Sequence, residues 1–193
     1  NYSEWITLLT SVINARGTLR MAAIGNESVI WLVKGVKAAF QKKIYEDSDK
    51  INRTELLGLV ENQIEYENLI NQFIENKIKI NNQFLLLGEI KDKSESTRFR
   101  NSKNLEKTKN SIENNSSVPL ETYSFEEIFN KFSGNLDIMI INVDGDRLNY
   151  LETKMREITS LVKVILVKST IKNGPKLNTK KVFKDFGWEE DIN

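Results

Sequence analysis

The chain has 193 residues, 39% of them hydrophobic and 28% charged, and its 28 basic and 27 acidic side chains leave a formal net charge of +1. This length favours a single domain over residues 1–193, and the balanced charge argues against a dedicated nucleic-acid binder. The chain contains no Cys and no His, which excludes disulfides, thiolate nucleophiles, zinc fingers and Ser-His or Cys-His dyads.

Hydrophobic periodicity predicts alternating helices and strands in the first half of the chain. Apolar residues at helical spacing predict helices over residues 1–17, Val29–Phe40 and Ile64–Ile74. Short apolar runs predict strands over Leu19–Ile24, Leu56–Val60 and Phe84–Leu87. Residues 91–117 are strongly polar, and we predict that they form a flexible loop.

The second half continues the alternation. Ser124 followed by Glu127 predicts a capping box at the start of a helix that runs to about Phe132. Strands are predicted over Ile138–Val143 and Val162–Val167, and helices around Leu148–Ile158 and Val182–Phe186.

Apolar strands alternating with helices are typical of a parallel sheet covered on both faces. We therefore predict an α/β protein with a doubly wound, mostly parallel sheet. Ligands in such folds bind beyond the carboxyl ends of the strands. No apolar run is long enough to span a membrane and no basic-then-apolar leader opens the chain, so we expect a soluble, cytoplasmic protein.

Two residues that follow predicted strands are candidate cofactor ligands. Gly25 follows the first strand and could let a cofactor approach the backbone, although an ordinary strand-to-helix turn explains it as well. The chain contains no GxGxxG and no GxxxxGK[ST] sequence. Glu61 follows the second strand and could accept hydrogen bonds from a ribose diol or favour the next helix N-terminus.

Polar residues also follow the later strands. Asn142 is polar within an apolar run, so its side chain needs a buried partner or a cleft. Asp144 and Asp146 could hold a divalent cation, but Asp-Gly-Asp is also common in turns, and we assign no metal site. Lys168 ends the fifth predicted strand, where we expect a solvated charge.

Two segments resemble the FkbM family of S-adenosylmethionine-dependent methyltransferases. The first runs from Leu56 through Glu61-Asn62 to the strand Phe84–Leu87. The second begins at Thr122-Tyr123-Ser124-Phe125-Glu126-Glu127 and continues through Ile140-Ile141-Asn142-Val143-Asp144-Gly145. The resemblance covers most of the chain from about Leu19 and implies a Rossmann-like class I methyltransferase fold.

The chain departs from the family pattern where the cofactor would bind. The glycine-rich Asp-x-Gly-x-Asn-x-Gly loop corresponds to Ala23–Val29, so its leading Asp is Ala23 and its second Gly is Val29. Asn142 replaces an Asp and Asp144 replaces a Glu, and Lys168 stands where a Glu usually ends the fifth strand.

The resemblance implies methyl transfer from S-adenosylmethionine to an oxygen of a sugar or small metabolite. Gly25, Asn26, Glu61, Gly88 and Glu89 would hold the cofactor. Asn142 and Asp144 would face the acceptor.

The alternative is a catalytically inactive methyltransferase-like module, a pseudoenzyme that serves as a binding or structural subunit. Its partner would be another protein or, in a homo-oligomer, a second copy of the chain. A third hypothesis assigns nucleic-acid contacts to the basic residues between Arg98 and Lys109.

Overall fold

The computed structural model describes residues 2–45, 51–78, 83–91, 121–143, 145–169 and 184–185. Nearly all of the predicted loop 91–117 lies outside the described residues. So do Asp144 and the apolar residues Val182, Phe183 and Phe186 of the predicted last helix.

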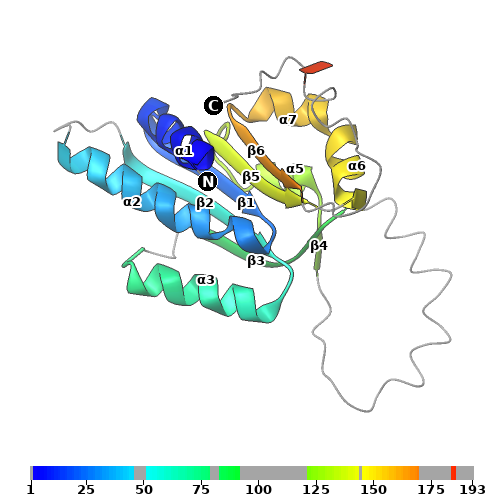
Figure 1. Ribbon diagram of the computed structural model, residues 1–193, viewed down its shortest axis with the longest axis horizontal. Helices are drawn as coiled ribbons and strands as arrows, with labels where there is room; N and C mark the ends of the chain where they lie inside the picture. Colours follow the sequence, from blue (N-terminus) through cyan, green and yellow to red (C-terminus); the bar gives the residue numbers. More distant parts are fainter. Residues whose placement is uncertain are drawn as a thin grey trace, which may run out of the picture.

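Helices and strands alternate along the chain as the periodicity predicts (Figure 1). The elements are α1 (Tyr2–Asn14), β1 (Gly17–Ile24), the 3-10 turn η1 (Asn26–Ser28), α2 (Ile30–Tyr45), β2 (Ile51–Val60), α3 (Gln63–Glu75), β3 (Gln83–Ile90), β4 (Glu121–Tyr123), α5 (Phe125–Phe129), β5 (Ile138–Val143), α6 (Gly145–Thr153), α7 (Met155–Leu161) and β6 (Ile165–Ser169).

The six strands form one sheet in the order β4-β3-β2-β1-β5-β6, and every pair is parallel. Helices α1, α2 and α3 lie on one face, and α5, α6 and α7 lie on the other (Figure 1). This is a doubly wound α/β sheet with a Rossmann-like arrangement, so the predicted fold class is confirmed.

Two hydrophobic cores flank the sheet because alternate residues of a strand face opposite sides. Met21 and Ala23 of β1 pack in the core under α1, α2 and α3. Ala22 and Ile24 pack in the core under α5, α6 and α7. Both faces of the central strands are therefore buried, which accounts for their continuously apolar sequences.

One buried carboxylate fixes the start of β5 against β1. Asp137 is 3% exposed, and its Oδ2 accepts a hydrogen bond from the Arg20 backbone N–H at 2.9 Å. The Asp137 N–H donates back to the Arg20 carbonyl at 2.9 Å, and Lys163 Nζ lies 2.7 Å from Asp137 Oδ1. The carboxylate is thus paired and hydrogen-bonded, as a buried charge must be.

Some predicted element boundaries are wrong. The helix predicted around Leu148–Ile158 is two helices, because the chain turns at Lys154, whose N–H donates to the Leu151 carbonyl at 3.1 Å. Leu151, Met155 and Ile158 nevertheless all remain buried in one core. The hydrophobic stripe therefore continues across the break, and periodicity alone does not locate the turn.

The third strand also extends beyond its predicted end at Leu87. β3 continues to Ile90 because Gly88, Glu89 and Ile90 pair with the short strand β4. The capping box of the next helix is confirmed: the Ser124 hydroxyl accepts from the Glu127 N–H, and the Glu127 carboxylate accepts from the Ser124 N–H.

Candidate functional site

The strand order reverses between β1 and β5, which makes their carboxyl ends the expected ligand-binding edge of the sheet. Ile24 of β1 lies level with Leu59 of β2 and Ile141 of β5. The residues that follow are Gly25, Val60 and Asn142. The topology thus brings Gly25, Glu61 and Asn142 to one edge, as the sequence predicts.

Gly25 brings the loop after β1 into contact with β5. Its φ of 93° lies in a region that side chains rarely adopt, and its N–H donates to the Leu59 carbonyl at 2.9 Å. A Cβ atom on Gly25 would lie 2.7 Å from the carbonyl oxygen of Asn142. The close approach that requires glycine is therefore to the backbone of β5.

The 3-10 turn η1 and the first residue of α2 follow Gly25 at this edge. The Ser28 N–H donates to the Gly25 carbonyl at 3.0 Å, and Ser28 is fully buried. Its hydroxyl oxygen has no hydrogen-bond partner among the described residues. Asn26 lies in η1, but its side chain is outside the described residues.

Val29 occupies the position of the second glycine in the family pattern. Its side chain is 4% exposed and packs in the core with Leu32 and Leu69. The branched side chain is buried, and it also borders the cavity between the start of α2 and α3.

Glu61 is half-buried directly after β2, and its neighbour Asn62 caps the following helix. The Asn62 side-chain oxygen accepts a hydrogen bond from the Glu65 N–H at 2.8 Å. Asn62 therefore supplies the N-cap of α3.

Gly88 and Glu89 lie within β3 and not beyond its end, contrary to the predicted boundary. A Cβ atom on Gly88 would meet the Glu121 carbonyl oxygen and the Tyr123 ring, so this glycine permits pairing with β4. Glu89 Oε1 lies 2.5 Å from Lys91 Nζ. Contacts at the β3–β4 edge therefore explain why glycine and glutamate occupy these two positions.

Tyr123 of β4 is half-buried at this edge of the sheet. Its hydroxyl donates to the Glu121 carboxylate. Burial, together with the neighbouring Glu121 and Glu127 carboxylates, raises the pKa of Tyr123 to about 12. The phenol therefore remains protonated at neutral pH and acts as a hydrogen-bond donor.

Lys168 is not the solvated charge that the sequence analysis expects. It lies beside Asn142 in the β5–β6 register, and its Nζ is 2.8 Å from Glu4 Oε1 on α1. The same ammonium lies 5.3 Å from the centroid of the Trp31 ring. The side chain is enclosed because Glu4 of α1 and Trp31 of α2 lie against it, contacts that local sequence cannot reveal.

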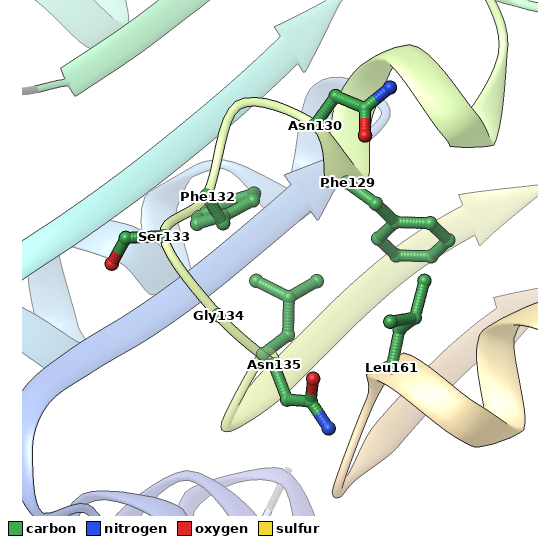
Figure 2. Close-up of a pocket in the computed structure, with 8 residues that line it drawn as sticks. Phe129, Asn130, Phe132, Ser133, Gly134, Asn135 and Leu161 are labelled. Carbon is green, nitrogen blue, oxygen red and sulfur yellow. The ribbon is translucent and has the colours of Figure 1, made fainter.

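Two of the cavities among the described residues bear on the site. One of about 220 Å³ is bordered by the segment before β5 and by the end of α7, which places it at the amino edge of the sheet, opposite the candidate site. Figure 2 shows Phe129 and Leu161 pointing toward one another in this cavity, with Asn130 and Asn135 directed away.

The second cavity, of about 140 Å³, lies between the start of α2 and α3 and includes Glu27, Val29 and Glu65. It is nearer the carboxyl edge of the sheet but smaller than the roughly 300–1,000 Å³ typical of ligand pockets.

No group of three or more Asp or Glu side chains suited to a metal ion occurs among the described residues. None of the helices in the described part of the chain is long and apolar enough to cross a membrane. Comparisons with protein-family models, curated proteins and solved structures give no match to this chain.

Proposed function

We propose that the chain is a cytoplasmic S-adenosylmethionine-dependent methyltransferase similar to the FkbM family. The supporting observation is the placement of Gly25, Glu61 and Asn142 at the carboxyl edge of β1, β2 and β5, where the strand order reverses between β1 and β5.

In this proposal Glu61 and η1 hold the cofactor, and Asn142 and Asp144 orient the acceptor. The Glu61 carboxylate accepts hydrogen bonds from the ribose hydroxyls, and the backbone of η1 lies against the remainder of the cofactor. The bound cofactor supplies an electrophilic methyl group. Asn142, and Asp144 directly after β5, orient an acceptor hydroxyl of a sugar or small metabolite, because methyl transfer depends mainly on positioning.

Calorimetric titration with S-adenosylmethionine and its demethylated product tests the cofactor site. We expect micromolar binding that Glu61→Ala weakens about tenfold, or about 1.4 kcal/mol. Glu75→Ala is the matched control, since Glu75 is an exposed carboxylate at the other end of α3. Absence of heat and of a thermal shift at millimolar ligand would contradict the proposal.

The second candidate function is a catalytically inactive module that binds a protein partner. The ion pair of Lys168 with Glu4 and the small size of the cavity near η1 favour it. Cofactor binding that is unchanged by Glu61→Ala, or absent, would support this alternative.

A further inference from the structure

One side of α1 exposes apolar side chains that the fold does not bury. The opposite side, with Leu8, Val12 and Ala15, packs in the core. The exposed side forms a stripe of four residues, which we call the α1 stripe: Tyr2, Trp5, Leu9 and Ile13 are 79%, 40%, 42% and 57% exposed. Their spacing of three or four residues places them on one side of the helix.

The α1 stripe contains no free acidic group. Glu4 is the one charged residue of α1, and its carboxylate is paired with Lys168. A surface helix of an ordinary domain usually carries charged residues on its outer side. The outer side of α1 instead combines aromatic and aliphatic residues with small polar ones.

Basic residues border the α1 stripe. Helix α2 lies beside α1, with the Trp5 and Trp31 ring centroids 5.4 Å apart (Figure 1). The Lys34 ammonium lies 5.0 Å from the Trp5 ring centroid and 3.9 Å from that of Trp31. Lys37 is exposed on α2, and Arg16 is exposed just beyond the end of α1.

The sequence is also more basic at the end that forms α1 and α2 than over its whole length. The first 45 residues contain six Lys or Arg and only two Glu, whereas basic and acidic residues nearly cancel over the whole chain. The end of the chain that forms α1 and α2 is therefore basic relative to the rest.

We propose that the α1 stripe and its basic border bind the surface of an anionic membrane. Amphipathic helices at membrane surfaces place Trp and aliphatic side chains among the headgroups and acyl chains, with Lys and Arg beside anionic lipids. Tyr and Trp are enriched at that boundary. The binding is peripheral and does not depend on the proposed methyltransferase activity.

The charge distribution distinguishes this partner from two others. In an antiparallel contact between two copies across the α1 stripe, the basic border of one copy would lie along that of the other, and like charges repel. A nucleic acid would neutralise those charges but would leave Leu9 and Ile13 without an apolar environment. An anionic bilayer offers both negative headgroups for the basic residues and an apolar environment for Leu9 and Ile13.

Co-sedimentation of the full chain with phosphatidylcholine vesicles, with and without phosphatidylserine, tests the proposal. We expect binding only to vesicles that contain phosphatidylserine, and weaker binding as salt screens the basic border. The double variant Leu9→Glu/Ile13→Glu should lower the bound fraction at least tenfold. Ile64→Glu/Ile74→Glu is the control, because both residues are also apolar and are even more exposed, on α3.

Circular dichroism would establish that both double variants remain folded. The proposal is wrong if the full chain fails to bind the anionic vesicles, or if Leu9→Glu/Ile13→Glu binds them as well as the unaltered chain. Self-association that this variant abolishes, without vesicle binding, would instead assign the α1 stripe to contact between two copies.

Discussion

Gly25 and Gly17 both have positive φ angles but lie in different surroundings. Their φ angles are 93° and 68°, both unfavourable for a side chain. A Cβ atom on Gly17 would meet nothing within 4 Å, whereas one on Gly25 would lie 2.7 Å from the Asn142 carbonyl oxygen. Comparing an alanine substitution at each position therefore distinguishes the cost of backbone strain from the cost of steric overlap.

We expect Gly25→Ala to lower the free energy of unfolding by about 2–4 kcal/mol, through strain and displacement of β5. Gly17→Ala should cost about 1 kcal/mol, through strain alone. Urea denaturation of both variants measures the difference. Equal losses would mean that the contact between Gly25 and Asn142 contributes nothing.

Glu55 is held at the amino edge of the sheet by Arg20 and Ser133. Arg20 Nε lies 3.1 Å from Glu55 Oε2, and the Ser133 hydroxyl donates to Glu55 Oε1 at 2.7 Å. Burial by itself would raise the pKa of this carboxyl. The hydrogen bonds from Ser133 and the Arg20 charge outweigh burial and hold the pKa of Glu55 below its usual range.

A lowered pKa in the folded state means that the Glu55 carboxylate stabilises the fold above its unfolded pKa of about 4.3. This contribution is lost as the pH falls through the folded value. We expect Glu55→Gln to unfold about 1–3 kcal/mol more easily at pH 7. The difference from the unaltered chain should shrink below pH ~4, as measured by urea denaturation at several pH values. A difference independent of pH would show that the charge is not responsible.

At the scale of elements, α1 is attached to β6 by an enclosed ion pair. The side chains of Lys168 and Glu4 are 21% and 14% exposed, and Glu4 Oε2 is buried without a hydrogen-bond partner among the described residues. Lys168 is therefore the main compensation for a buried negative charge.

We expect Lys168→Met to destabilise the fold by about 2–4 kcal/mol, because it leaves the Glu4 carboxylate uncompensated. The double variant Glu4→Gln/Lys168→Met should regain part of that loss. Thermal denaturation of the single and double variants measures the coupling. Additive effects would show that the two side chains do not interact energetically.

At the scale of the whole molecule, sequence periodicity predicted the layers of the fold better than its contacts. The strand Ile138–Val143 and the capping box at Ser124 were identified because each depends on neighbouring residues. β4 was missed because three residues carry no periodic signal, and their strand conformation depends on pairing with β3. The sequence therefore placed Gly88 and Glu89 at a strand end.

The sequence also predicted only part of the candidate site. The edge that joins Gly25, Glu61 and Asn142 follows from topology, which the alternation of elements predicts. The partner of Lys168 did not follow, because Glu4 is distant in sequence. The cavity at the amino edge was also missed, since Phe129 and Leu161 meet only after α5 and α7 pack.

The hydrogen bonds of Asp137 have a consequence for misfolding. Sliding β5 past β1 by one residue would exchange the faces of Ile138 and Met139, yet both cores would still receive apolar side chains. Hydrophobicity alone therefore discriminates poorly between correct and slipped pairings. A slipped strand would separate the Asp137 carboxylate from the Arg20 N–H and leave a buried carboxylate oxygen without that hydrogen bond. Asp137 thus selects the correct alignment by penalising the alternatives.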